Sequence, residues 1–197
     1  MLNHFFVLLS FSAVLGAQTV STYVPMTQTE RWKEFTKETF TSPGIYFSSL
    51  GAALGGQLNN RPSEWGQGVE GYAHRTGYFY ALNVMDKTIR NSSAAAFGHD
   101  VRYEPSKKKG LLPRSGYALS RAFVTRNREG KLVPYVSNFI GNYGSGMIST
   151  YMLPDRYDPI KNGLQAGHIM FASNAGGNLL REFGPDLKKA FRRMWRN

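Results

Sequence analysis

The chain has 197 residues, a formal net charge of +11, no cysteine and a mean hydropathy of −0.35. This length allows one ordinary domain with a sizeable core. The lack of cysteine excludes disulfide bonds and a lipid-accepting thiol, and the mean hydropathy is unlike that of a polytopic inner-membrane protein. The charge favours polyanionic partners such as anionic lipid, lipopolysaccharide or nucleic acid, although a basic surface can also serve solubility alone.

The first residues, 1–17, have the pattern of a secretory signal peptide. No charged residue occurs before Gln18, and residues 5–15 form an apolar run that ends in Gly16 and Ala17. The run is shorter than the roughly 20 residues that span a bilayer. We therefore expect cleavage before Gln18 and export of the mature chain. An uncleaved N-terminal anchor is the alternative, because the segment lacks Lys and Arg and its bulky Leu15 stands near the cleavage point.

The next segment, residues 18–41, is polar and predicts one short amphipathic helix at 29–35. Thr27 or Thr29 is expected to cap its N-terminus, because a threonine side chain can accept a hydrogen bond from the first free backbone N–H groups. One side of this helix would carry the aromatic residues Trp32, Phe35 and Phe40.

Residues 42–197 are expected to form a single, mainly α-helical domain, a compact bundle of about five to seven helices. A long amphipathic helix is predicted at 71–97, and three stretches rich in small residues, 43–60, 133–154 and 162–180, contain no charged residue. Glycine inside a helix costs about 1 kcal/mol relative to alanine, so its repetition indicates close helix approach. The predicted helix-packing glycines are Gly51, Gly55, Gly141, Gly144, Gly163 and Gly167.

The uncharged stretches also raise the question of membrane spans. They are 18, 22 and 19 residues long, which suits a bilayer crossing. Their asparagines, glutamines, serines and tyrosines do not suit one. We therefore favour a soluble or peripherally bound bundle over membrane-embedded helices.

Two local patterns refine this organisation. Residues 121–136 read either as a β-hairpin turning at Asn127–Gly130 or as a polar loop between helices, and the loop is the preferred interpretation. A weak internal repeat relates 100–105 to 155–159. Glycine after phenylalanine, at Gly98 and again at Gly184, predicts that a helix ends at each of these positions.

No catalytic motif stands out. The histidines of the mature chain, His74, His99 and His168, have no metal-ligand spacing, so we expect neither a metal site nor a cofactor. The nearest approach to a serine-hydrolase elbow, at Ser145, lacks the full pattern of that motif. No phosphate-binding loop is present.

The densest polar constellation is the run 70–75 together with residues 99–103. A ligand pocket would draw on Glu70, His74, Arg75, His99, Asp100, Arg102 and Tyr103. The competing interpretation, which we prefer, is a set of structural Arg–acid–Tyr contacts that includes Arg121 and Arg126, since charges inside a bundle must be paired.

These segments, with Thr125–Gly130 and Arg181–Asp186, resemble an uncharacterised family of exported, glycine-rich helical proteins of acidobacteria-like bacteria. The resemblance extends from about residue 43 to 189 and implies export and a shared fold. Relatives carry lysine where His74 stands, which argues against a required imidazole there. No activity or site residue follows from this resemblance.

The sequence thus predicts an exported protein of the periplasm or outer membrane with a structural, membrane-associated or partner-binding role and no enzymatic activity. The expected partner is an anionic lipid or lipopolysaccharide surface, or another envelope protein, with a homo-oligomer as a further option. Export makes nucleic acid a poor partner. The alternative function is a periplasmic enzyme or ligand-binding protein with a pocket around Glu70, His74, His99 and Arg102.

Overall fold

The computed structural model describes residues 23–195. The signal-peptide prediction for residues 1–17 lies outside this range. In chain order the elements are α1 (Gln28–Thr36), a π-helical turn (Lys37–Thr41), α2 (Pro43–Leu58), a 3-10 turn (Ser63–Trp65), α3 (Gly68–Phe97), α4 (Leu111–Ser120), β1 (Val124–Arg126), β2 (Leu132–Pro134), α5 (Val136–Ser149), a 3-10 turn (Thr150–Met152) and α6 (Pro159–Met194). The predicted mainly α-helical bundle is confirmed, with six α-helices in the described range.

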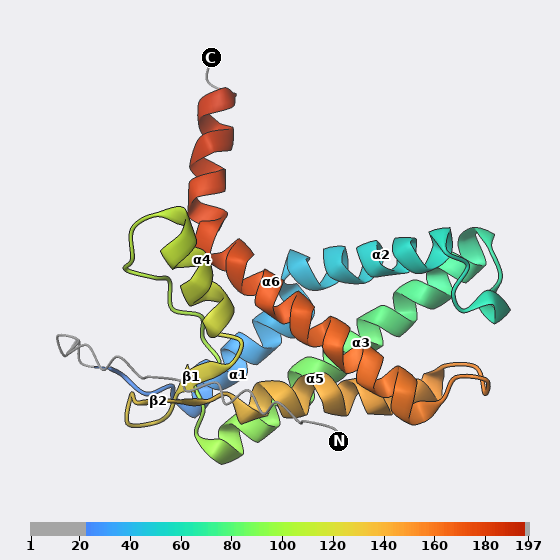
Figure 1. The fold of residues 1–197 in the computed structure, drawn as a ribbon, viewed down its shortest axis with the longest axis horizontal. Coiled ribbons are helices and arrows are strands. Elements are labelled where there is room, and N and C mark those ends of the chain that lie inside the picture. Colours follow the sequence, from blue (N-terminus) through green and yellow to red (C-terminus); the bar gives the residue numbers. More distant parts are fainter. Residues whose placement is uncertain (1–22, 196–197) are drawn as a thin grey trace, which may run out of the picture.

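The long helix α3 organises the bundle. Its most extensive contacts are with α5 on one side and α2 on another, while α5 also packs against α6 (Figure 1). The helix ends as predicted, because Gly98 adopts a left-handed conformation with φ 68°. The following N–H, that of His99, donates to the Ala94 carbonyl at 2.9 Å. A residue with a side chain would adopt this conformation only at an energetic cost.

Helix α1 begins as the sequence predicts. The Thr27 side chain accepts from the Glu30 N–H, and the Glu30 carboxylate accepts from the Thr27 N–H, so each side chain satisfies a backbone donor of the other residue. The Phe35 ring contacts both Trp32 and Phe40, with ring centroids 5.5 and 6.0 Å apart. The aromatic cluster expected on one side of this segment is therefore present.

Residues 124–134 form a hairpin, so the preferred loop interpretation is wrong. The two strands pair antiparallel, with Thr125 opposite Val133. Asn127 closes the turn, because its Oδ1 accepts from the N–H groups of Glu129 and Lys131, both at 3.0 Å. Gly130 takes a positive φ of 78°, and a Cβ there would lie 2.8 Å from the Tyr23 ring. The hairpin that the sequence offered as the alternative is therefore the one formed, with strands of three residues each.

The predicted end of a helix at Gly184 is also wrong. Helix α6 continues through Pro185 to Met194, and it changes direction in its last third (Figure 1). A proline inside a helix removes one backbone hydrogen bond and favours a bend rather than an end when the flanking turns are held elsewhere. Beyond the bend, residues 185–195 are all exposed, and they project away from the other helices (Figure 1).

The interior is unusually polar. Helix α5 presents a row of small and amide side chains toward the interior, and all of them are buried: Ser137, Asn138, Asn142, Ser145 and Ser149. These groups are satisfied locally, as buried polar groups must be. Asn142 Nδ2 donates to the Asn138 carbonyl at 2.7 Å, and Asn174 of α6 donates to Asn142 Oδ1 at 2.6 Å. No helix within residues 23–195 is both long and apolar enough to cross a membrane.

Candidate functional site: a cationic cavity

A cavity of ≈ 700 Å³ lies among the helices. Its walls come from the π-helical turn, the first turns of α2, the second half of α3, the segment after α3, the α4–β1 junction, the start of α5 and the middle of α6. The charged residues that line it are Glu38, Lys87, Arg90, Arg102, Arg121 and Arg181. One carboxylate and five basic side chains thus line the cavity, and the carboxylates of Asp86 and Asp100 pair with two of these cations, so the cavity has a net positive character.

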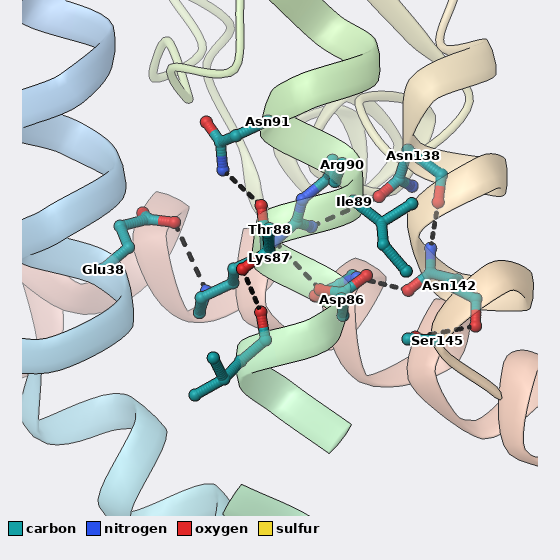
Figure 2. A network of polar contacts seen from close by, with 12 residues as sticks. Glu38, Asp86, Lys87, Thr88, Ile89, Arg90, Asn91, Asn138, Asn142 and Ser145 are labelled. Carbon is teal, nitrogen blue, oxygen red and sulfur yellow. Dashed lines mark hydrogen bonds and ion pairs between the residues drawn. The ribbon is translucent and has the colours of Figure 1, made fainter. Parts of the chain in front are cut away.

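The α3 wall carries a buried ion pair between two residues that lie one helical turn apart. Arg90 Nη2 lies 3.1 Å from Asp86 Oδ2, and Arg90 Nη1 donates to Asn138 Oδ1 at 3.3 Å (Figure 2). Burial opposes the charged form of Arg90, but the Asp86 carboxylate outweighs it and raises the pKa of the guanidinium. Arg90 therefore stays charged in the fold, with its own counter-ion.

Glu38 joins three elements at the rim. Its carboxylate lies 3.5 Å from Lys87 Nζ and also forms an ion pair with Arg181 of α6 (Figure 2 shows the contact with Lys87). Burial alone would raise the pKa of Glu38, but Arg181, Lys87 and Arg90 together hold it below its ordinary value. Burial and the neighbouring Arg90 lower the pKa of Lys87. One carboxylate is thus shared between two cations.

Arg121 differs from the other cations. It stands directly after α4, its exposed fraction is 6%, and it lines the cavity. Its backbone N–H donates to the Tyr117 carbonyl. Within residues 23–195, its guanidinium has no hydrogen-bond or ion-pair partner.

The segment after α3 brings together four of the residues predicted as a ligand pocket. Asp100 accepts from Arg102 Nε and Nη2 at 3.0 and 2.6 Å, and from the Tyr23 hydroxyl at 2.8 Å. Burial would raise the pKa of Asp100, but these hydrogen bonds hold it below its ordinary value. Tyr103 donates to Glu182 of α6 at 2.9 Å. His99 Nδ1 lies 2.8 Å from Ser137 Oγ, and burial together with Arg31 lowers the pKa of its imidazole.

The other three predicted pocket residues lie at the opposite end of α3. Since a helix rises about 1.5 Å per residue, Glu70 and His74 stand roughly 40 Å from His99. Glu70 and His74 are exposed, and the His74 ring stacks on Trp65. A pocket that joins Glu70 and His74 to His99 and Arg102 is therefore not formed, because one straight helix separates the two pairs.

Arg75 has a structural role at that far end. Its buried guanidinium donates to the carbonyls of Arg61, Pro62 and Gly66 at 3.0, 2.7 and 2.9 Å, and to Gln57 Oε1 at 2.7 Å. Four of its five N–H donors hold the connection between α2 and α3. This supports the competing interpretation that the arginines of these segments tie the fold together.

The predicted helix-packing glycines divide into two groups. A Cβ on Gly141 would lie 2.6 Å from Arg90 Cβ, one on Gly167 would lie 2.5 Å from the Tyr143 ring, and one on Gly163 would collide with Met147. A Cβ on Gly144 would make ordinary contact with Ile89 at 3.6 Å. Within residues 23–195, no atom beyond the helix's own neighbouring backbone lies within 4 Å of a Cβ on Gly51 or Gly55. These two face outward on α2, so the packing role predicted for them is wrong within this chain.

Several residues of the site were missed by sequence reasoning. Glu38 and Lys87 sit in unremarkable polar sequence, and their neighbours across the cavity come from distant segments. Asn138 and Asn142 offered a signal, because two asparagines four residues apart inside an uncharged helix lie on one face and need buried partners.

The cavity is lined by guanidinium, ammonium, amide and hydroxyl groups, which suit the binding of a polar or anionic ligand. Ser145 is fully buried and donates to the Asn142 carbonyl at 3.1 Å, with no base beside it in the described chain. No three side chains of His, Asp or Glu between residues 23 and 195 come together as a metal site. Comparison with protein-family models, with curated proteins and with solved structures finds no match to this chain.

Proposed function

We propose that this protein is a non-enzymatic protein of the bacterial cell envelope that attaches to an anionic lipid surface through the last turns of α6. The observation that carries the proposal is the segregation of side chains in residues 187–195. Its apolar residues are exposed: Leu187 by 49%, Phe191 by 60%, Met194 by 67% and Trp195 by 88%.

Helical geometry places these apolar residues on one face. Leu187, Phe191 and Met194 are spaced by four and three residues, so they lie on the same side at 100° per residue. The basic residues Lys188, Lys189, Arg192 and Arg193 occupy the other side, and all four are exposed. A helix with large apolar residues on one face and Lys and Arg on the other is typical of an interfacial membrane helix.

The position of this segment supports the same proposal. It extends beyond the bend at Pro185 and away from the bundle (Figure 1), so it can lie on a surface without disturbing the helices. The exposed tryptophan is a residue that favours the lipid head-group region. The four cations argue for an anionic lipid surface rather than for an apolar protein groove, because each contributes about 1 kcal/mol near such a surface.

The test is sedimentation of the purified chain with vesicles of phosphatidylcholine alone or mixed with phosphatidylglycerol. We expect binding only to the anionic vesicles and release by salt. Changing Lys188 and Lys189 together to glutamine should weaken binding roughly thirtyfold, since two contributions of about 1 kcal/mol are lost.

A matched control removes the same charge elsewhere. Lys107 and Lys108 are exposed in the loop before α4, and their double change to glutamine should leave vesicle binding within about twofold of wild type. Equal losses in both double variants would refute attachment through α6. Equal binding to neutral vesicles, or self-association through the same face without lipid, would also refute it.

A further inference from the structure

The charges around the cavity are not balanced. Arg90 has Asp86 as its counter-ion, Arg102 has Asp100, and Glu38 is shared between Lys87 and Arg181. Arg121 is left without a counter-ion in residues 23–195. Its 6% exposure, with no partner for its guanidinium anywhere in residues 23–195, leaves a buried cation facing the cavity.

The Arg121 guanidinium is therefore available to a partner that enters the cavity. A buried charge loses its hydration and must recover that loss from a counter-ion or from hydrogen bonds. Every other buried arginine on this side of the molecule recovers it within the chain. A guanidinium held without a partner in a polar cavity is the arrangement expected when the partner is an anion from outside.

We propose that the cavity is a binding site for a small phosphorylated polyol, held by its phosphate group on Arg121. The planar fork of a guanidinium matches two oxygens of a phosphate. A phosphomonoester carries more negative charge than a carboxylate and three acceptor oxygens. It is therefore the better match to a cavity whose five basic side chains are offset by three carboxylates, Glu38, Asp86 and Asp100.

The size and lining of the cavity indicate the rest of the ligand. A volume of ≈ 700 Å³ exceeds what a lone phosphate needs, and the remaining wall is rich in amides and hydroxyls, among them Asn83, Asn174, Asn178, Ser48 and Ser173. Asn91 also lines the cavity, and its Oδ1 is a buried acceptor without a hydrogen-bond partner in the described chain. A phosphate beside hydroxyl groups is found in a free polyol phosphate, which is a monoester, and in a phosphoglycerol lipid head group, which is a diester with a single negative charge.

The experiment is calorimetric titration of the purified chain with glycerol 3-phosphate, with glycerol and inorganic phosphate as comparisons. We expect saturable binding of glycerol 3-phosphate, none of glycerol, and weaker binding of inorganic phosphate. Arg121→Gln should weaken the affinity at least about tenfold, since a charge-assisted bidentate contact is lost. Arg128→Gln, which removes the same charge from an exposed residue of the hairpin turn, should leave the affinity unchanged.

Two further measurements distinguish a loss of binding from a loss of folding. Without ligand, Arg121→Gln should melt at or above the wild-type temperature, because it removes an unpaired buried charge. In the wild-type chain, the Arg121 Nε–H resonance should shift during the titration with glycerol 3-phosphate. Absence of that shift, equal binding of glycerol, or full affinity in Arg121→Gln would each overturn the proposal.

The two sources of the ligand are separated by the vesicle assay. If the ligand is free, Arg121→Gln keeps full binding to phosphatidylglycerol vesicles; if it is a lipid head group, that binding falls and added glycerol 3-phosphate competes with it. In both cases the Lys188 and Lys189 double variant keeps its affinity for soluble glycerol 3-phosphate. If the test of attachment through α6 fails, the proposal for the cavity still stands. If the test of the cavity fails, attachment through α6 still stands.

Discussion

At the scale of single residues, the surroundings of a glycine decide its role. Gly51 and Gly146 both lie inside helices of uncharged sequence. A Cβ on Gly146 would lie 2.5 Å from the Gly163 carbonyl oxygen and 2.7 Å from the Gly167 backbone nitrogen, whereas a Cβ on Gly51 would meet nothing within 4 Å. Gly146 permits the contact between α5 and α6, whereas Gly51 makes no contact with another element in residues 23–195.

This difference predicts opposite effects of one substitution. Gly146→Ala should lower the free energy of unfolding by about 2 kcal/mol or more, because backbone atoms of α6 must move apart. Gly51→Ala should raise it by up to about 1 kcal/mol, since alanine is the better helix former. Chemical denaturation of both variants measures the two changes. Equal destabilisation by both would show that the outward face of α2 is covered in the native protein.

At the scale of elements, α6 is fixed by Glu182 just before its bend. The carboxylate accepts from Arg114 Nε of α4 at 2.7 Å, from the Tyr103 hydroxyl at 2.9 Å and from the Ser106 N–H at 2.8 Å. Burial would raise the pKa of Glu182, but these three donors hold it below its ordinary value. One carboxylate thus joins α6, α4 and the segment between α3 and α4.

Glu182→Gln should therefore lower the melting temperature by roughly 5–10 °C, because the buried donors lose their anionic acceptor. Glu129→Gln is the matched control. Glu129 pairs with Lys131 across an exposed turn, and exposed ion pairs contribute little. Melting curves followed by circular dichroism compare the two variants, and a melting temperature unchanged by Glu182→Gln would remove this carboxylate from the account of how α6 is held.

The elements differ in how well they could be predicted. The helices around Thr27 and up to Gly98 follow from local capping signals, and the helix count follows from patterning. The continuation of α6 through Pro185 does not follow from local signals, because Arg114 of α4 pairs with Glu182 before the proline and with Asp186 after it. The predicted pocket combined two polar runs, residues 70–75 and 99–103, and α3 holds these two runs at its opposite ends. The cavity was missed because its walls come from seven segments, which only the tertiary structure brings together.

At the scale of the whole molecule, polar contacts replace much of the usual apolar core, so the fold depends on the charge states of buried groups. Three of these groups, Glu38, Asp100 and Glu182, have pKa values held below their ordinary ones by cations or hydrogen bonds. A carboxyl whose pKa is lower in the folded state stabilises the fold above its unfolded pKa, and that contribution is lost as the pH falls through the folded pKa. The molecule should therefore unfold progressively in acid below about pH 4.5.

Because of His99, the free energy of unfolding should begin to fall at a higher pH than these carboxylates alone would cause. Its exposed fraction is 6%, it contacts Ser137 Oγ, and burial and Arg31 hold its pKa below the ordinary value of 6.5. Between pH 6.5 and the lower folded pKa, the unfolded chain binds a proton that the folded chain does not, so the free energy of unfolding falls by up to about 1.4 kcal/mol per pH unit. His99→Gln should abolish this part of the slope while leaving the acid unfolding below it, and His168→Gln, at an exposed position on α6, should keep the wild-type profile. Urea denaturation at intervals from pH 7.5 to pH 5 measures the slope. If His99→Gln retains the slope, another group must take up the proton. The neutral, buried imidazole beside Ser137 is then not what makes this fold sensitive to mild acid.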